Sequence, residues 1–289
     1  MWDIEGKTIL ITGGSSGVGR ATATTLSAKR ADVVITARNL ERARQAADEI
    51  EQSTGNQLRP MELDLASVTS VRAFCKRFLE EQSYLHVLIN NAGTVQAKRR
   101  ETVDGLEMTF AVHYLGPFLL TSLLLDRILQ SAPARIINVS SRIHRLAKNG
   151  LDFDDLQLEK GYSGRRAYAQ SKLALELFTR ELAARLADKA VTVNSIHPGA
   201  VITNLRADAG PLVKLLFFVL RPTLLTPEES AEAVRLLATD PALQTVTGQY
   251  FSKGEQAEPS EQAQDIAAAK RLWEATENLL ASLPTRGYS

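Results

Sequence analysis

The chain has 289 residues, of which 44% are hydrophobic and 23% charged, and its formal net charge is +1. This composition is ordinary for a water-soluble globular protein, and the small net charge gives a nucleic acid no general electrostatic reason to bind. Cys75 is the only cysteine and the four histidines are scattered, so neither an intrachain disulfide nor a metal site is predicted.

Short apolar runs alternate with helical patterns along most of the chain. The runs are rich in Val and Ile without alternating in polarity, which is typical of strands covered on both faces of a parallel sheet. Strands are expected at 8–12, 32–37, 57–63, 86–90, 135–140 and 191–196. Helices are expected at 17–29, 40–53, 67–82, 105–130 and 164–187. This order predicts an α/β fold, with one doubly wound, mostly parallel sheet and helices on both of its faces.

The segment 200–226 interrupts this alternation and is expected to be an insertion on the substrate side, over the carboxyl edge of the sheet. A helix near 227–238, a short strand at 248–251 and a C-terminal helix at about 260–281 follow it, and residues 1–289 are expected to form one domain. The longest apolar stretch, 212–220, is too short to cross about 30 Å of hydrocarbon. Because the first strand begins near residue 8, no signal peptide is expected, and a cytoplasmic protein is predicted.

A glycine-rich turn, "TGGSSGVGR" at 12–20, follows the first strand and opens the first helix. Glycines here let the backbone approach a pyrophosphate, which then faces the N-terminus of the helix. A P-loop is the rival interpretation, but Arg20 and Ala21 stand where a Lys and a Ser or Thr would be needed. The turn therefore predicts a dinucleotide site, formed by Gly13, Ser15, Ser16, Gly17, Val18 and Gly19.

The second strand ends at Arg38, and no Asp or Glu occupies that position. An acidic residue there would accept hydrogen bonds from the ribose of NAD, whereas an arginine suits the 2′-phosphate of NADP. Arg20 could add a second positive contact. NADP(H) is therefore the expected cofactor, and NAD(H) is less favoured.

Taken together, the motifs resemble those of the short-chain dehydrogenases/reductases, which have a Rossmann-type fold. The chain carries "TGxxxGxG" at 12–19, "DL" at 64–65, "NNAG" at 90–93, "VSS" at 139–141, "YxxxK" at 168–172 and "HPG" at 197–199. Longer stretches, such as "GLEMTFAVHYLGPFLLTSLLL" at 105–125 and "TGQYFS" at 247–252, are similar to the retinol dehydrogenase-like branch. The resemblance covers roughly residues 5–280, and the N-terminal membrane anchor of vertebrate members is not expected in this chain.

The resemblance implies a role for each matching residue. Asp64 and Leu65 would flank the adenine, and Ser141 would bind the substrate oxygen. The remaining cofactor residues would be Asn90, Ala92, Gly93, Pro198, Gly199 and Thr203. The resemblance also implies a homo-oligomer, either a dimer or a tetramer.

Tyr168 and Lys172 lie four residues apart on a predicted helix and therefore share one face of it. A nearby cation lowers the pKa of a phenol, and a general acid works best when its pKa approaches the operating pH. Tyr168 is predicted to be the general acid/base, and Lys172 is predicted to tune it and to bind the nicotinamide ribose.

His113 departs from the family pattern, which usually has an asparagine at this place. The resemblance implies that the backbone carbonyl at this position holds a water leading to Lys172. A histidine keeps the carbonyl, but its ring could displace the water, titrate near neutral pH, or simply pack. A second hypothesis follows from this departure: the chain could bind the cofactor as a sensor or scaffold, with weak or no catalysis.

The apolar side chains of segment 200–226 suggest the wall of a lipophilic pocket, an amphipathic lid, a patch that touches a membrane surface, or simple packing on the fold. The family branch implies retinoid-like or other lipophilic aldehydes, ketones and alcohols as substrates. A serine hydrolase is excluded because "NVSSR" lacks the glycines of a nucleophile elbow.

Overall fold

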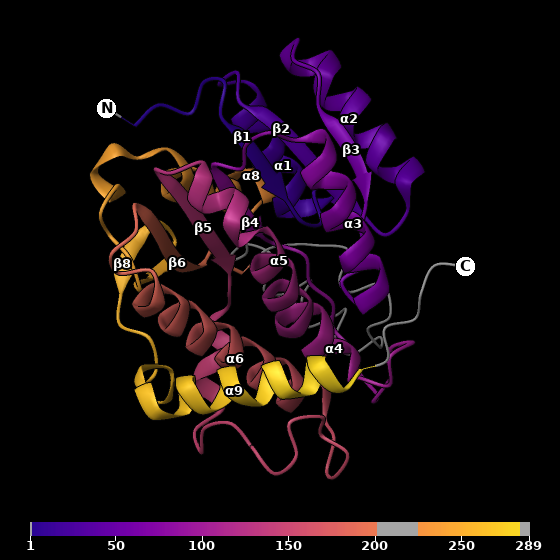
Figure 1. The fold of residues 1–289 in the computed structure, drawn as a ribbon, viewed down its shortest axis with the longest axis vertical. Coiled ribbons are helices and arrows are strands. Elements are labelled where there is room, and N and C mark those ends of the chain that lie inside the picture. Colours follow the sequence, from indigo (N-terminus) through magenta and orange to yellow (C-terminus); the bar gives the residue numbers. More distant parts are fainter. Residues whose placement is uncertain (1, 201–224, 284–289) are drawn as a thin grey trace.

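One eight-stranded sheet forms the centre of the computed structural model, which describes residues 2–200 and 225–283 (Figure 1). The strands lie in the order β3-β2-β1-β4-β5-β6-β7-β8, and only the β7/β8 pair is antiparallel. Their bounds are β1 Thr8–Ile11, β2 Asp32–Ala37, β3 Arg59–Glu62, β4 Val87–Asn90, β5 Ala134–Val139, β6 Val191–His197, β7 Tyr250–Ser252 and β8 Glu255–Ala257. Because β1 lies between β2 and β4, the strand order reverses there, and this is where doubly wound sheets bind ligands.

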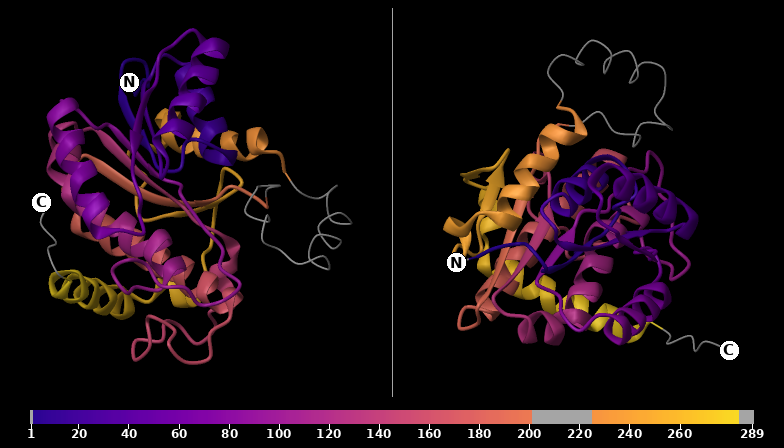
Figure 2. Two further views of the ribbon diagram at one scale, coloured as in Figure 1. Left: turned by 90° about the vertical axis from the view of Figure 1, so that its right-hand side faces the viewer. Right: turned by 90° about the horizontal axis from the view of Figure 1, so that it is seen from above.

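Successive strand residues point to opposite faces of the sheet and build a separate hydrophobic core on each. On one face Ile9 and Ile11 pack with α1 Gly17–Ser27, α2 Leu40–Thr54 and α8 Pro227–Thr239. On the other face Leu10 packs with α3 Val68–Glu81, α5 Gly116–Gln130, α6 Gly164–Arg185 and α9 Ile266–Ser282. Figure 2 shows α8, in orange, running beside α1, in indigo, although about 200 residues separate them.

Local signals in the sequence explain where several helices begin and end. Side chains of Asn39, Ser67 and Ser163 accept hydrogen bonds from the first turns of α2, α3 and α6. Thr226 and Glu229 form a reciprocal capping box at the start of α8. Gly55, with a φ of +74°, ends α2 in the left-handed conformation that glycine adopts without strain.

The predicted strands and helices are confirmed in kind and in order, with three differences. The short edge strand β8 was not predicted, because its residues Glu-Gln-Ala carry no apolar alternation. The helix expected at 105–130 is interrupted: α4 Met108–Phe110 leads into a π-helical turn, η1 Ala111–Leu115, before α5 begins. The start of the C-terminal helix also moves, because a 3-10 turn at Glu261–Gln264 precedes α9.

The continuous helical stretch Met108–Gln130 is long and apolar enough to span a membrane by length and composition, with a mean hydropathy of 1.5. However, 78% of its apolar window is buried inside the protein. The core of the fold therefore accounts for its apolar character.

Candidate active site

The glycine-rich turn connects β1 to α1 at the switch point of the sheet. Gly13 and Gly17 have φ angles of +67° and +54°, a region that favours glycine. A Cβ on Gly19 would lie 2.4 Å from the carbonyl oxygen of Gly13, so the turn can close only with glycine at this position. Ser16 is the N-cap of α1 but makes no side-chain cap hydrogen bond, which leaves the first-turn N–H groups available to an anion.

The residues that follow β4 hold the glycine-rich turn in place through Thr12, but the side chain of Asn90 does not take part. Thr12 Oγ1 accepts hydrogen bonds from the backbone N–H groups of Asn91 (2.9 Å) and Ala92 (3.0 Å). Asn91 Nδ2 donates to the carbonyl of Thr12 at 2.8 Å. Asn90 instead turns its side chain into the sheet, where Nδ2 donates to Asn138 Oδ1 at 2.8 Å. The NNAG motif contained Asn91, but its spacing alone did not show that this side chain braces the turn.

Arg38 stands at the carboxyl end of β2 with its side chain exposed, and it forms no ion pair with any described residue. Arg20, the other candidate, is paired with Glu49 at 2.6 Å and is therefore already engaged. Beyond β3, Asp64 Oδ1 accepts a hydrogen bond from the backbone N–H of Ala66, which shapes the loop expected beside the adenine. The side chain of Leu65 packs in the hydrophobic core, and its place beside the adenine stays a prediction.

The residues of the turn therefore fit a dinucleotide on structural grounds. Glycines allow the tight backbone of the turn, the first turn of α1 has no side-chain cap, and the exposed guanidinium of Arg38, without an ion pair among the described residues, lies at the β2 end. Ser15 and Val18 lie half-buried in the same turn.

Ser141, Tyr168 and Lys172 come together at the carboxyl end of β5. Ser141 is the N-cap of the 3-10 turn η2 Arg142–Leu146, where its Oγ accepts a weak hydrogen bond from Ile143 N at 3.3 Å. Tyr168 and Lys172 lie on α6, and Lys172 Nζ donates to the carbonyl of Val139 at 2.8 Å. The three side chains thus form the constellation that the sequence predicts.

The electrostatics of this constellation differ from the sequence prediction. Desolvation by burial raises the pKa of Tyr168, and a contact with the Ser141 side chain offsets this only in part. Burial also lowers the pKa of Lys172 to about 8, against the opposing charge of Glu176. The net pKa of Tyr168 is therefore raised rather than lowered in this structure, because loss of water outweighs the contact with Ser141.

His113 is buried within the π-helical turn, and both of its ring nitrogens are engaged. Nε2 accepts a hydrogen bond from Thr94 N at 2.8 Å, so Nδ1 carries the proton and donates to Ser171 Oγ at 2.9 Å. Ser171 Oγ in turn donates to the carbonyl of Tyr168 at 2.9 Å. Burial and the charge of Lys172 hold the pKa of His113 well below its usual value. The imidazole is thus a neutral brace between the NNAG loop and α6.

The backbone around His113 is set up by its neighbours in sequence. Pro117 follows it by four residues and has no N–H, so it cannot donate the α-helical hydrogen bond to the carbonyl of His113. A Cβ on Gly116 would lie 2.6 Å from the carbonyl oxygen of Leu65, so only glycine permits this close approach. These two residues favour the π-helical turn and keep one donor away from the His113 carbonyl.

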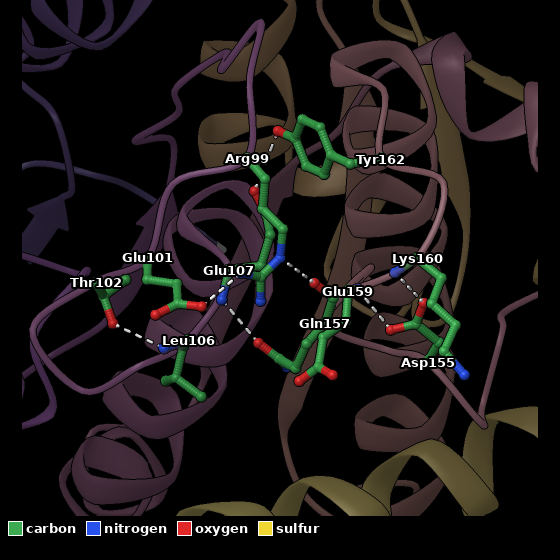
Figure 3. Close-up of polar contacts among 10 residues, drawn as sticks. All are labelled: Arg99, Glu101, Thr102, Leu106, Glu107, Asp155, Gln157, Glu159, Lys160 and Tyr162. Atoms are coloured by element: carbon green, nitrogen blue, oxygen red, sulfur yellow. Dashed lines mark hydrogen bonds and ion pairs between the residues drawn. The ribbon is translucent and has the colours of Figure 1, made fainter.

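The loop after β4 is tied to the segment before α6 by the polar contacts of Figure 3. Arg99 Nε donates to the carbonyl of Gln157 at 3.2 Å, and Gln157 Oε1 accepts from Glu107 N at 2.7 Å. Tyr162 Oη donates to Glu107 Oε1 at 3.3 Å. Glu107 is fully buried and also caps α4. This network fixes the start of α6, and hence Tyr168, relative to the π-helical turn.

The last described part of the site is the segment that follows β6, up to residue 200. Pro198 and Gly199 are buried, and Gly199 has a φ of +109°. A Cβ on Gly199 would lie 2.3 Å from Leu225, whose N–H donates to the carbonyl of Ala200 at 2.8 Å. Thr203 and nearly all of the predicted substrate-side insertion lie outside the described residues.

Comparisons with known proteins agree with this site. The sequence model of the short chain dehydrogenase family matches residues 7–152 and 156–212. Retinol dehydrogenase 14 of Mus musculus is 42% identical over 297 residues, covering 97% of this chain and 87% of the mouse protein. Retinol dehydrogenase 11 of Homo sapiens is 40% identical over 278 residues, covering 96% of this chain and 86% of the human protein.

Solved structures give the same result. A putative uncharacterized protein from Mycobacterium paratuberculosis has a TM-score of 0.77 and 30% identity, covering 98% of this chain and 97% of that one. A short chain dehydrogenase from Shigella flexneri, complexed with NADP, has a TM-score of 0.69 and 27% identity, covering 88% and 99%. The chain therefore belongs to the short chain dehydrogenase family and is an oxidoreductase of the retinol dehydrogenase-like kind. A nicotinamide dinucleotide is accordingly its cofactor class.

Proposed function

We propose that the protein is an NADP(H)-dependent oxidoreductase that interconverts a lipophilic aldehyde or ketone, retinoid-like or otherwise, with its alcohol. The observation that carries the cofactor choice is Arg38, whose exposed guanidinium at the end of β2 forms no ion pair within residues 2–200 and 225–283. The substrate class rests on the similarity to proteins named retinol dehydrogenases.

In this proposal the cofactor, when bound, supplies or accepts the hydride at the carbonyl carbon, and the chain's own residues handle the oxygen. Ser141 donates a hydrogen bond to the substrate oxygen as negative charge develops on it. In the reductive direction Tyr168 transfers its phenolic proton to that oxygen. Lys172 is charged below its pKa of about 8 and stabilises the tyrosinate that remains. Oxidation of an alcohol follows the same path in reverse.

A substrate panel of aldehydes, ketones and quinones, followed by the absorbance of NADPH, tests this function. The Tyr168→Phe variant keeps the ring but loses the proton donor, so turnover should fall by ~10²–10⁴ while NADPH affinity changes little. Near-parent turnover in this variant would show that Tyr168 is not the acid. NADPH binding without turnover of any panel member would favour the alternative of a cofactor-binding sensor or scaffold.

A cytoplasmic location and a homo-oligomer stay predictions from the sequence, as does peripheral contact of segment 200–226 with a membrane. Size-exclusion chromatography with light scattering tests the oligomer, and co-sedimentation with lipid vesicles tests the membrane contact.

A further inference from the structure

A buried carboxyl group lies directly behind the catalytic lysine. Glu176 follows Lys172 by one turn of α6 and therefore shares its face of the helix. Its relative exposure is only 4%, and its Oε2 accepts a hydrogen bond of 2.5 Å from Ser195 Oγ on β6. The other carboxyl oxygen, Oε1, has no hydrogen-bond partner among the described residues. The mechanism described above does not use this group.

The surroundings of Glu176 are polar but only partly paired. Ser140 Oγ, at the end of β5, and the hydroxyl of Tyr250, on β7, are also buried without partners in the described part of the chain. Ser140 lowers the pKa of the Glu176 carboxyl, although no hydrogen bond of normal geometry joins the two. A buried carboxylate that is always ionised would need more hydrogen-bond donors than Glu176 has. The unpaired oxygens around it therefore favour a carboxyl group that can gain and lose a proton.

The charged neighbours of Glu176 come from two elements. Lys172 lies on α6 itself, and Arg145 approaches from η2; both favour the ionised carboxylate. Tyr250, the titratable group on β7, stays protonated because burial and the charge of Glu176 raise its pKa to about 12. No nitrogen–oxygen distance between Lys172 and Glu176 falls within 4.0 Å, so the two described side chains interact without a direct ion pair.

The balance between burial and charge brings the two groups into the same pH range. Burial raises the pKa of Glu176 to about 7 and lowers that of Lys172 to about 8, while each charge favours ionisation of the other. Groups that interact this closely titrate as a pair rather than separately.

We propose that Glu176 is a positioning residue: its buried carboxylate, held by Ser195 one helical turn from Lys172, keeps the lysine charged beneath Tyr168. The coupling is electrostatic, because the side chains of Glu176 and Lys172 make no direct ion pair. The consequence for catalysis rests on the proposed function, because it acts through Lys172 on the tyrosine. The coupling itself depends only on the contacts of α6 with β5, β6 and η2.

The first test does not require turnover. Carboxyl-carbon NMR of glutamate-labelled protein should show one resonance titrating well above the ordinary glutamate value of about 4.3. That resonance should disappear in Glu176→Gln and persist in Glu181→Gln, a matched control that changes another buried glutamate of the same helix. Lys172→Met should raise its midpoint by about 1–2 pH units, because a favourable charge is lost. An ordinary midpoint, or one that Lys172→Met does not move, would overturn the proposal.

The second test measures how Glu176 influences the pH dependence of catalysis by Tyr168. In Glu176→Gln the lysine loses its partner, so the alkaline limb of kcat/KM for carbonyl reduction should move about one pH unit lower. Glu181→Gln should leave that limb in place. A Glu176→Gln profile superimposable on the parent's would reduce Glu176 to a structural partner of Ser195 and overturn the proposal. If the protein reduces no carbonyl at all, the proposed function fails, yet the NMR titrations still decide whether the charges of Glu176 and Lys172 are coupled.

Discussion

At the scale of single residues, the proposed preference for NADP(H) depends on Arg38. Its guanidinium can form charge-assisted hydrogen bonds with a 2′-phosphate, each worth about 1.5–3 kcal/mol. NADPH should therefore bind more tightly than NADH, and Arg38→Asp should reverse the preference by repelling the phosphate and accepting from the ribose hydroxyls. Direct titration of both cofactors checks this. Equal affinities in the parent would show that Arg38 is only a surface cation, and Arg42→Asp, on the exposed side of α2, is the control.

His113 is the other residue whose role a single substitution decides. Its imidazole is neutral and held at both nitrogens, so it has no free position from which to carry a proton. His113→Asn should keep kcat within about tenfold of the parent, or ~1.4 kcal/mol in the barrier, because the backbone carbonyl is retained. Its pH–rate profile should not lose an inflection near 6.5, the usual pKa of histidine. A loss beyond about a hundredfold would mean that the ring itself is essential for catalysis.

At the scale of elements, the π-helical turn η1 is where the expected relay through the His113 carbonyl can be tested. Pro117→Ala supplies an N–H at the position where an α-helix would donate to the His113 carbonyl. If that carbonyl holds the relay water, as the family likeness implies, kcat should fall by about tenfold while the melting temperature does not decrease. Steady-state kinetics and thermal unfolding measure the two effects.

Pro227→Ala, at the first turn of α8, is the matched control and should leave kcat unchanged. Parent-like kcat in Pro117→Ala would separate the π-helical turn from the chemistry.

The helices and strands also show how much of the fold and of the site could be predicted from the sequence. The Val- and Ile-rich runs predicted the parallel strands because their apolar pattern reports burial on both faces. The motifs predicted Ser141, Tyr168 and Lys172 together, because Ser141 follows the end of β5 and the N-terminal half of α6 carries Tyr168 and Lys172 to the same edge of the sheet. The roles of Asn91 and Glu176 were not predictable, since their partners Thr12 and Ser195 lie on other elements. A helical pattern shows that Glu176 shares a face with Lys172, but not which strand covers that face.

At the scale of the whole molecule, buried histidines make the fold sensitive to acid. Burial lowers the pKa values of His113 and His144, and it lowers that of His197 to about 4. A histidine with a depressed pKa stays neutral in the folded state while the unfolded chain takes up a proton below about 6.5. Its contribution to stability is therefore present above pH 6.5 and is lost as the pH falls toward the folded pKa.

Glu176 changes the stability of the fold in the opposite direction to the histidines, over an overlapping pH range. Its raised pKa of about 7 means that the folded state holds a proton that the unfolded chain releases above about 4.5. Its contribution is present at low pH and is lost as the pH rises through 7. The pKa of His86 is lowered as well, so four histidines oppose one glutamate, and the free energy of unfolding should decrease overall between pH 6.5 and 4.5.

Two substitutions should change this acid sensitivity in opposite directions. His197→Asn removes a group whose shift is worth on the order of 3 kcal/mol, so its unfolding free energy should fall less steeply with acid than the parent's. Glu176→Gln removes the opposing contribution, so its unfolding free energy should fall more steeply. Urea denaturation of the parent and both variants at several pH values measures the slopes. A His197→Asn curve that runs parallel to the parent's would show that His197 titrates normally in the folded protein, and that its burial carries no such cost.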